Sequence, residues 1–183
     1  MSDISIRVAE RADAAALSEL AAETFPLACP PSTTPDAIAE FIAEHFTVER
    51  LSAWLEDADR TVLVAEEPGG RLVGYSMLIG GASGEPGDAD AAAAISARPA
   101  IELSKFYTRA AAHGSGTVAG PLMTATIDAA GGTAASTVWL GVNEENARAI
   151  RFYEKHGFGK VGRKRFRLGD RLEEDWVLEH PLG

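Results

Sequence analysis

Apolar and polar residues alternate along the first part of the chain with the short period of a β-strand. This pattern covers residues 4–9 (ISIRVA), and two further strands are predicted at the largely apolar segments 61–66 (TVLVAE) and 71–80 (RLVGYSMLIG). The EPGG sequence between the last two segments is typical of a hairpin turn, so these strands should pair antiparallel. The Ala- and Leu-rich segment that runs from Asp13 to Thr24 predicts a helix after the first strand.

Two more helices are expected before the hairpin, because apolar residues there recur every three or four positions. Asp36 can open the first helix, and Thr47 can cap the second. The side chains expected to face inward are those of Ile38, Phe41 and Ile42 in the first helix and of Val48, Leu51 and Leu55 in the second.

In the second half, strands are expected at residues 100–108 (AIELSKFYT) and 136–142 (STVWLGV), each followed by a helix, and two final strands close the chain. This order predicts one mixed α/β domain over residues 1–183, with helices covering a sheet. Residues 81–98 (GASGEPGDADAAAAISAR) lack sustained apolar periodicity and are interpreted as a mobile loop. A flavodoxin-like nucleotide binder is disfavoured, because the first half lacks alternating strands and helices.

Composition narrows the class of protein. Hydrophobic residues make up 46% and charged residues 24%, as in soluble globular chains. No segment approaches the ~18 apolar residues of a membrane span, and the start lacks a secretory signal, so we expect a cytoplasmic protein without a membrane partner. A net charge of -10 argues against nucleic acid as a partner and favours a cationic substrate such as an amine. The lone Cys29 excludes an internal disulfide and, in a Pro-rich loop, is interpreted as incidental rather than nucleophilic.

A glycine-rich segment stands where a predicted strand runs into a helix. Gly114 and Gly116 let the backbone approach a ligand, and Ser115 and Thr117 offer hydroxyl groups. The N-terminus of the next helix presents unpaired N–H groups, which suit a pyrophosphate. A plain turn and helix cap would explain the same residues equally well. Neither a dinucleotide fingerprint nor the Lys of a Walker A loop is present.

The helix after the strand at 136–142 carries a polar stripe. Asn143 is predicted as its N-cap, and Asn146, Ile150 and Tyr153 share one face. The amide and the phenol could point into a common cleft, although a core Tyr whose hydroxyl reaches water would also fit. Gly157 is the expected helix stop.

Together these segments resemble the GNAT acetyltransferases. NARAIRFYEKHGF at 146–158 is similar to the superfamily's N-x-x-A-x-x-F-Y-x-x-x-G-F signature, and HGSGTV occupies the place of its coenzyme A motif, Q/R-x-x-G-x-G/A. His113 stands in the first position of that motif, Gly116 in the fourth and Val118, which departs from the usual small residue, in the sixth. The resemblance implies a mostly antiparallel sheet of about seven strands, flanked by helices and splayed at its central parallel strands.

The resemblance also implies an activity: direct transfer of acetyl from acetyl-CoA, the cosubstrate, to a primary amine. Tyr153 is expected to protonate the leaving thiolate, and Glu102 to take the proton of the amine, directly or through a water. Backbone N–H groups of Phe106 and Thr108 would hold the acetyl and pantetheine groups, and Asn146 would bind through its amide. The residues expected at coenzyme A are Phe106, Tyr107, Thr108, His113, Gly114, Ser115, Gly116, Thr117, Val118, Ala119 and Asn146.

The acceptor is expected to be a small-molecule amine or polyamine. The ETF near the first helix, WLGV, and FRLGD with the later Asp175 are similar to bacterial spermidine/spermine-type acetyltransferases. A homodimer is carried over from the family. The alternative function is a catalytically degenerate GNAT domain that serves as an acyl-CoA sensor or a protein-interaction module.

Other residue types suggest structural roles. His45, His156 and His180 are scattered without ligand spacing, so they are interpreted as surface or capping residues and no metal is expected. The basic run Arg163, Lys164, Arg165 and Arg167 is interpreted as an exposed strand face rather than a contact to the 3′-phosphate of coenzyme A. Trp139 and Trp176 are expected in the core or at an interface.

Overall fold

The computed structural model describes residues 3–80 and 83–183. Seven strands form one sheet in the order β1-β2-β3-β4-β5-β7-β6, and every neighbouring pair is antiparallel except β4–β5. The strands are β1 (Ser5–Val8), β2 (Arg60–Glu66), β3 (Leu72–Ile79), β4 (Ala100–Thr108), β5 (Thr137–Asn143), β6 (Gly159–Leu168) and β7 (Arg171–Pro181). The mixed α/β sheet expected from the sequence is confirmed.

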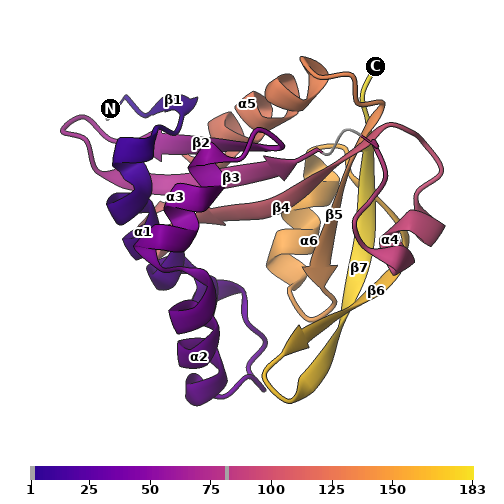
Figure 1. Ribbon diagram of the computed structural model, residues 1–183, viewed down its shortest axis with the longest axis horizontal. Helices are drawn as coiled ribbons and strands as arrows, with labels where there is room; N and C mark the ends of the chain where they lie inside the picture. The colour runs from indigo at the N-terminus through magenta and orange to yellow at the C-terminus, as the bar shows by residue number, and fades with distance from the viewer. Residues whose placement is uncertain (1–2, 81–82) are drawn as a thin grey trace.

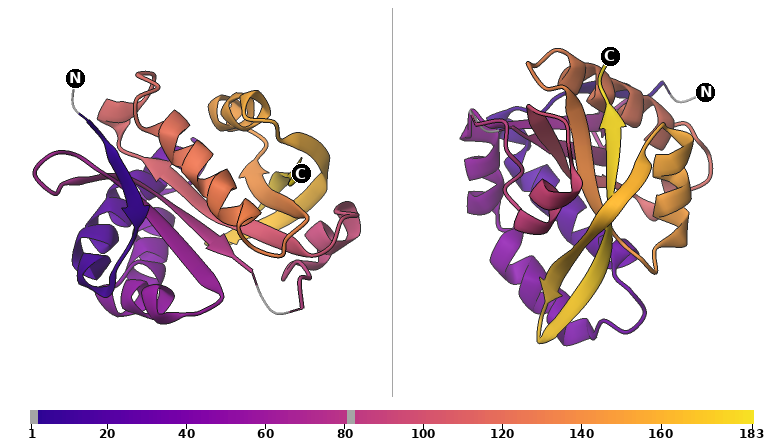
Figure 2. Two further views of the ribbon diagram at one scale, coloured as in Figure 1. Left: turned by 90° about the horizontal axis from the view of Figure 1, so that it is seen from above. Right: turned by 90° about the vertical axis from the view of Figure 1, so that its right-hand side faces the viewer.

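Helices cover both faces of this sheet (Figure 1). They are α1 (Ala14–Thr24), α2 (Pro35–His45), α3 (Val48–Glu56), α4 (Ala89–Ala94), α5 (Ala119–Gly131) and α6 (Ala147–Lys155), with 3-10 turns η1 (Arg11–Asp13), η2 (Phe25–Ala28) and η3 (Ala110–Ala112). Figure 2 shows α1 and α3 on one side of the strands and α5 and α6 on the other. None of the helices in the described ranges is long and apolar enough to cross a membrane.

Each face of the sheet has its own apolar core. On one face Leu17, Leu20 and Leu51 pack against Tyr75 and Met77 of β3. The core of the other face joins α5 and α6 to the sheet through Leu78, Leu103, Met123, Leu140, Ile150 and Leu178. In β3, Met77 and Ile79 face the first core and Leu78 between them faces the second, as the two-residue period of a strand requires.

Threonine side chains cap the first turns of α2 and α3, and only the start of α2 differs from the one expected. Thr47 Oγ1 accepts a hydrogen bond from the N–H of Arg50 at 3.2 Å, as predicted for an N-cap. The preceding helix begins at Pro35 rather than at Asp36, and its N-cap is Thr34, whose Oγ1 accepts from Ala37 N–H at 3.2 Å. Proline at the first helical position needs no N–H partner, which explains the earlier start.

The interpretation of 81–98 as a mobile loop without secondary structure is wrong for part of that segment. Residues 81–82 lie outside the described residues, but Ala89–Ala94 form helix α4, capped by the Asp88 side chain. Helix α4 packs on β6, and Ala91 and Ile95 are buried there with Trp139 and Val177. Six residues are too few to show helical periodicity, so packing rather than pattern stabilises this helix.

The parallel pair β4–β5 is short. It joins Ala100–Glu102 to Thr137–Trp139 only, after which β5 stays paired with β7 while β4 stays paired with β3. The two strands therefore diverge (Figure 1), as expected at the centre of the sheet. The edge of β4 beyond Glu102 is left without a strand partner on the β5 side.

Candidate active site

A cleft of about 750 Å³ opens where β4 and β5 separate. Its walls come from the end of α1 and η2, from β4, from the loop before α5, from α6 and from the β6–β7 hairpin. The cleft thus lies at the one place where the sheet is incomplete, and it reaches both faces of β4.

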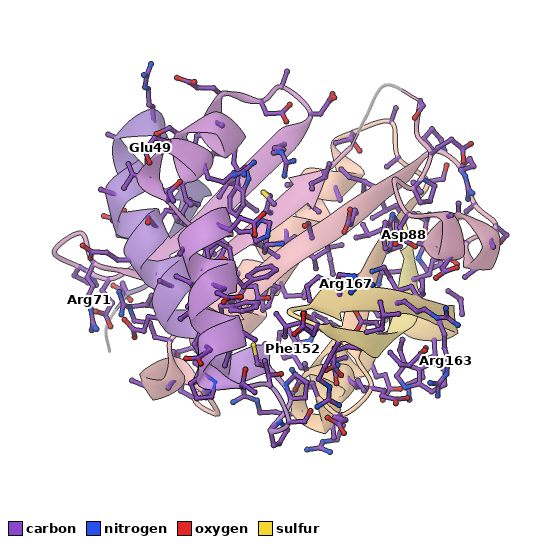
Figure 3. The ribbon with its side chains drawn as sticks, turned by 60° about the horizontal axis from the view of Figure 1, so that its bottom comes forward. Glu49, Arg71, Asp88, Phe152, Arg163 and Arg167 are labelled. Carbon is purple, nitrogen blue, oxygen red and sulfur yellow. The ribbon has the colours of Figure 1, made fainter. Side chains whose placement is uncertain are left out.

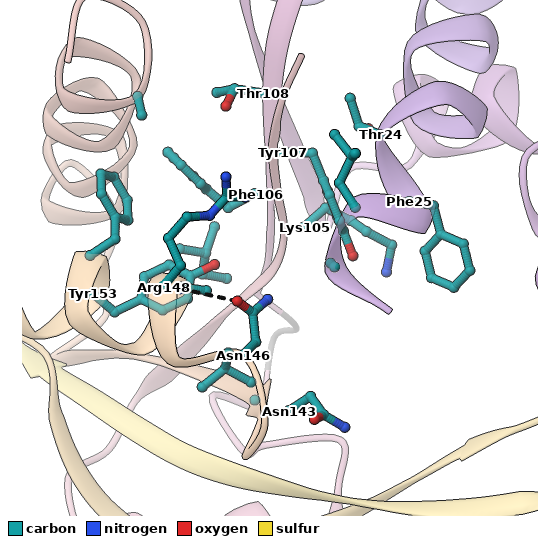
Figure 4. A pocket seen from close by; sticks show the side chains of 18 of the residues that line it. Thr24, Phe25, Lys105, Phe106, Tyr107, Thr108, Asn143, Asn146, Arg148 and Tyr153 are labelled. Atoms are coloured by element: carbon teal, nitrogen blue, oxygen red, sulfur yellow. Dashed lines mark hydrogen bonds between the residues drawn. The ribbon is translucent and has the colours of Figure 1, made fainter. Parts of the chain in front are cut away.

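One extra residue in β4 decides which side chains face which side. Leu103 pairs with Leu78 and Lys105 with Met77, so Ser104 is a β-bulge. Because of it, Glu102 and Lys105 lie on the same face, together with Tyr107. We call this the α1 side. Figure 4 shows Lys105 and Tyr107 pointing toward Thr24 and Phe25 of α1 and η2.

The opposite face of β4, the α6 side, carries Phe106 and Thr108 (Figure 4). The Arg109 N–H donates to Val73 O of β3 at 2.9 Å. Since N–H groups alternate in direction along a strand, those of Thr108 and Phe106 point away from β3, into the cleft. These are the two N–H groups that the family resemblance assigns to the acetyl and pantetheine groups.

The glycine-rich loop borders the α6 side. Gly114 and Gly116 have φ of +80° and +69°, and a Cβ added to either would meet no atom within 4 Å. Their role is therefore conformational, because L side chains rarely adopt such φ values. Helix α5 begins at Ala119, and its N-cap residue, Val118, has no side-chain acceptor for the first N–H groups.

The residues expected in this loop do not all face the cleft. His113, Gly114, Gly116 and Ala119 line it. The hydroxyl groups of Ser115 and Thr117 instead hydrogen-bond to each other at 2.9 Å on the exposed surface. The Val118 side chain points away from the cleft and is buried against Ala65 and Val73.

His113 ties the loop to its surroundings. Its Nε2 lies 3.0 Å from Thr108 O at the end of β4, and its Nδ1 lies 2.5 Å from Arg148 Nη1 on α6. Arg148, Arg151 and Lys155 line the same part of the cleft. These three cations give this part of the cleft a positive charge, which the overall charge of -10 conceals. Sequence analysis did not single them out, although all three lie within the segment that carries the superfamily signature.

The N-cap prediction for α6 is wrong by three residues. The helix begins at Ala147, and Asn146 Oδ1 accepts a hydrogen bond from Ala149 N–H at 3.1 Å, the dashed line of Figure 4. Asn143 is the last residue of β5, and its Oδ1 accepts from Glu145 N–H at 2.9 Å. Both residues line the cleft, and the Asn146 NH₂ group is left to donate to a ligand.

Tyr153 sits among aromatic rings on the α6 side. Phe106, Phe152 and Phe158 lie 5.7–6.3 Å from it between ring centroids. Burial raises the pKa of its phenol well above the usual range, so the hydroxyl carries its proton at neutral pH.

The α1 side is charged. Burial raises the pKa of Glu102, while the Lys105 ammonium counteracts this shift. Burial in turn lowers the pKa of Lys105. Two further carboxylates from β7, Glu173 and Asp175, line the cleft, and burial raises the pKa of Asp175 to about 6.

The basic run on β6 divides by alternation. Lys164 faces the cleft, with its side chain only 12% exposed, whereas Arg163, Arg165 and Arg167 lie on the other face of the hairpin. Figure 3 shows Arg163 at the outside of the hairpin and Asp88 near α4. Arg163 pairs with Glu144 at 2.6 Å and lies over the Trp176 ring. The exposed-face interpretation is wrong for Lys164 alone.

Trp139 and His156, for which the sequence predicts structural roles, lie in the core and at a helix end. Trp139 is buried beneath α4. The ring Nδ1 of His156 lies 2.8 Å from Phe152 O at the end of α6, as a capping role requires. Cys29 lines the cleft, but burial raises the pKa of its thiol to about 11, so little thiolate forms at neutral pH.

Comparison with known proteins places this geometry in a family. The model of the acetyltransferase (GNAT) family matches residues 15–158. An uncharacterized N-acetyltransferase of Mycobacterium tuberculosis (strain ATCC 25618 / H37Rv) is 42% identical over 170 residues, which is 93% of this chain and 98% of that protein.

Two solved structures share the fold. PaiA N-acetyltransferase from Thermoplasma acidophilum, in complex with coenzyme A, is similar with a TM-score of 0.75 and 19% identity over 97% of this chain and 98% of that one. YncA, a putative acetyltransferase from Salmonella typhimurium with acetyl-CoA, has a TM-score of 0.71 and 21% identity over 100% and 95%. The chain therefore belongs to the GNAT family of acetyltransferases.

Proposed function

We propose that this acetyltransferase moves an acetyl group from acetyl-CoA to the primary amine of a small molecule by direct transfer, without an acyl-enzyme. The observation that carries the proposal is the cleft itself. It runs from a glycine-rich helix start, past the phenol of Tyr153, to the carboxylate of Glu102 at the same break in the sheet. A diphosphate, a thioester and an amine would meet there in that order.

The residues present fit coenzyme A. The first N–H groups of α5, after two glycines with positive φ, suit its pyrophosphate, and Arg148 and Arg151 add charge for phosphate oxygens. The free edge of β4 offers the N–H groups of Phe106 and Thr108 to the pantetheine arm and the acetyl oxygen. Asn146 keeps its NH₂ group for the same ligand.

Acetyl-CoA supplies an activated acetyl group as a thioester. The amine must be neutral to form the C–N bond, so Glu102 takes its proton, directly or through a water. A raised pKa makes Glu102 a stronger base than an ordinary glutamate. As the C–S bond breaks, the Tyr153 hydroxyl gives its proton to the departing sulfur, and the acylated nitrogen loses its second proton, which restores the Tyr153 phenol directly or through solvent. The products are the N-acetylated amine and free coenzyme A.

The departures of Val118 and His113 from the family pattern motivate the rival, a sensor that binds acyl-CoA without catalysis. Val118 points its side chain into the sheet, so it does not fill the cleft. His113 holds the loop through Thr108 and Arg148, which suits a retained donor site. The geometry therefore favours the enzyme.

Within the class of primary amines, polyamines are one candidate. The motif similarity to spermidine/spermine-type enzymes supports them, as do the carboxylates of Glu102, Glu173 and Asp175 in the cleft. We keep a homodimer and a cytoplasmic location as parts of the proposal that await measurement.

The test combines calorimetry with a thiol assay. Coenzyme A and acetyl-CoA are titrated into the protein, and release of free thiol from acetyl-CoA is then followed with a panel of primary amines, amino acids and polyamines. Binding with acceptor-dependent thiol release supports the enzyme. Binding without release on any acceptor supports the sensor, and absence of binding by either form of coenzyme A overturns both.

A further inference from the structure

The α1 side of the cleft holds an ammonium group that the proposed reaction does not use. Lys105 Nζ makes two long hydrogen-bond contacts, at 3.4 Å, to the carbonyl oxygen and the hydroxyl of Ser104, and it lies 5.9 Å from the centre of the Trp54 ring. Among the residues that the structure describes, no carboxylate oxygen lies within 4.0 Å of it. A partly buried ammonium group without a close counter-ion is costly, and an anion bound here would stabilise its charged form.

The bulge at Ser104 brings this ammonium group to the proposed base. In a regular strand Glu102 and Lys105 would face opposite sides of the sheet, but the extra residue puts both on the α1 side. Their charges influence each other's pKa values, yet no oxygen of Glu102 comes within ion-pair distance of Lys105. Both side chains line the cleft, so a ligand bound there can contact both groups.

A second ammonium group, that of Lys164, extends into the cleft from β6. Lys164 has a side chain 12% exposed, and its stem lies against Gly141, where an added Cβ would come within 3.0 Å of Lys164 Cδ. Its one ion pair among the described residues is to Asp88 at 3.6 Å, longer than a hydrogen bond. Lys164 lines the same cleft as Glu102 and Lys105.

Aromatic rings bound this space on the remaining side. Phe41 of α2 stacks on Phe25 at 4.4 Å and meets Phe166 of β6 edge-on at 6.1 Å, and all three rings line the cleft. We call the space between these rings and Glu102, Lys105 and Lys164 the acceptor chamber. It offers the Glu102 carboxylate, two ammonium groups and an apolar wall, and the carboxylates of Glu173 and Asp175, the latter opposite Lys164 on β7, line the same cleft.

We propose that the acceptor is a zwitterion, an α-amino acid with an apolar side chain, whose carboxylate binds Lys105 and Lys164. This inference rests on the proposed acetyl transfer and names its substrate class. The amine lies toward Glu102, which takes its proton, and the side chain packs against Phe41 and Phe166. The carboxylate supplies the counter-ion that Lys105 lacks in the protein itself.

A polyamine would bring further positive charge into this space. Its remaining ammonium groups would have to enter a chamber that already holds Lys105 and Lys164. The carboxylates of Glu173 and Asp175 would attract such groups, because Glu173 Oε1 has no hydrogen-bond partner in the described part of the chain and Asp175, with a pKa of about 6, is largely ionised at neutral pH. An amino acid instead brings one positive charge toward Glu102 and one negative charge toward the two ammonium groups.

The test compares each amino acid with the amine that lacks its carboxylate. Initial rates of thiol release are measured for leucine against 3-methylbutylamine, methionine against 3-methylthiopropylamine, and phenylalanine against phenethylamine, with spermidine as the polyamine. We expect kcat/KM at least tenfold higher for the amino acid of the best pair. Preference for the bare amines or for spermidine overturns the zwitterion while leaving the acetyltransferase intact, whereas no thiol release with any acceptor overturns the proposed function itself.

Variants locate the carboxylate. Lys105→Met should raise KM for the amino acid at least tenfold and leave KM for the matched amine within twofold, and Lys164→Met should act in the same direction. Arg165→Met, on the outer face of β6, is the control and should change neither value. Calorimetry with coenzyme A checks that each variant keeps its donor site. An equal rise in KM for the amino acid and for the matched amine in Lys105→Met contradicts the proposal.

Discussion

The two sides of β4 are built in different ways. On the α6 side the main chain supplies much of the site: two glycines, the start of a helix and the free N–H groups of a strand edge, with the side chains of α6 around them. The α1 side consists of charged side chains brought together from β4, β6 and β7. A backbone site suits a ligand that every member of a family shares, and a side-chain site can change its ligand by substitution. Variants can show whether the two sides act separately.

Replacement of Tyr153 by Phe should give the largest effect. The phenol lies on the α6 side among aromatic rings, so loss of its proton should lower kcat by about 10²-fold or more while the shape of the pocket stays the same. Stopped-flow or steady-state thiol release measures kcat, and calorimetry with coenzyme A should give an unchanged Kd. Tyr75→Phe is the matched control, because the Tyr75 hydroxyl is buried without a hydrogen-bond partner in the described part of the chain. Equal kcat for Y153F and the wild type would remove Tyr153 from the mechanism.

Substitution of Gly116 by Val tests the backbone side. A β-branched residue at φ +69° costs about 1–3 kcal/mol, so the loop should adopt another conformation. We expect binding of coenzyme A to weaken by about 10–100-fold. Gly131→Ala, at an open position of α5 without positive φ, should bind normally. Tight binding by G116V would mean that this glycine does not set the phosphate site.

Gly162→Ala tests the support of the other side. A Cβ there would lie 2.5 Å from Ala94 Cβ, so α4 would have to move away from β6. Overpacking of this kind costs about 1–3 kcal/mol of unfolding free energy. Because α4 carries Asp88 to Lys164, KM for the acceptor should rise while the Kd of coenzyme A stays constant.

The control for this variant is Gly159→Ala on the same strand, where no atom lies within 4 Å of the added Cβ. Denaturant unfolding of both proteins gives the stability difference. Weaker donor binding in G162A alone would show that the two sides are coupled through the sheet.

The smallest effect is a shift in pH dependence. Glu102 acts as a base when deprotonated, so kcat should rise with pH through its pKa, which burial holds above the usual range. The Lys105 charge lowers that pKa, and Lys105→Met should therefore move the rising limb to higher pH. The pH dependence of kcat, measured with a simple amine as acceptor, gives the position of the rising limb. Arg165→Met should not change that position. A shift to lower pH, or none, would indicate that Glu102 is not the base.

The contrast between the two sides also explains what could be predicted from the sequence. Strand-like patterns, turn residues and the glycines before α5 are local signals, and they located the sheet and the loop at 113–119, whereas the splay was expected only from the family resemblance. Helix α6 was expected from its residues, but its start was set three residues too early. Asn143 and Asn146 both have cap chemistry, and only the path of the chain after β5 decides between them.

The charged side depends on register, which a single sequence does not reveal. Nothing in ELSKFY marks Ser104 as the extra residue, so the shared face of Glu102 and Lys105 could not be foreseen. Lys164 lay within a run of cations that looked uniform until pairing with β7 separated the two faces of β6. Helix α4 was missed because its six residues are ordered by contact with Gly162 and Trp139, not by their own pattern.

The bulge at Ser104 reverses which side of the sheet the odd-numbered and the even-numbered residues of β4 face. Before it the even-numbered position 102 looks toward α1, and after it the odd-numbered positions 105 and 107 do so. Deleting one residue here would exchange the two sets and present the wrong groups to each ligand, even though the strand would still pair. Conversely, substitutions at positions 102 and 105 can alter the choice of acceptor, while positions 106 and 108, which face the other side, continue to bind the donor.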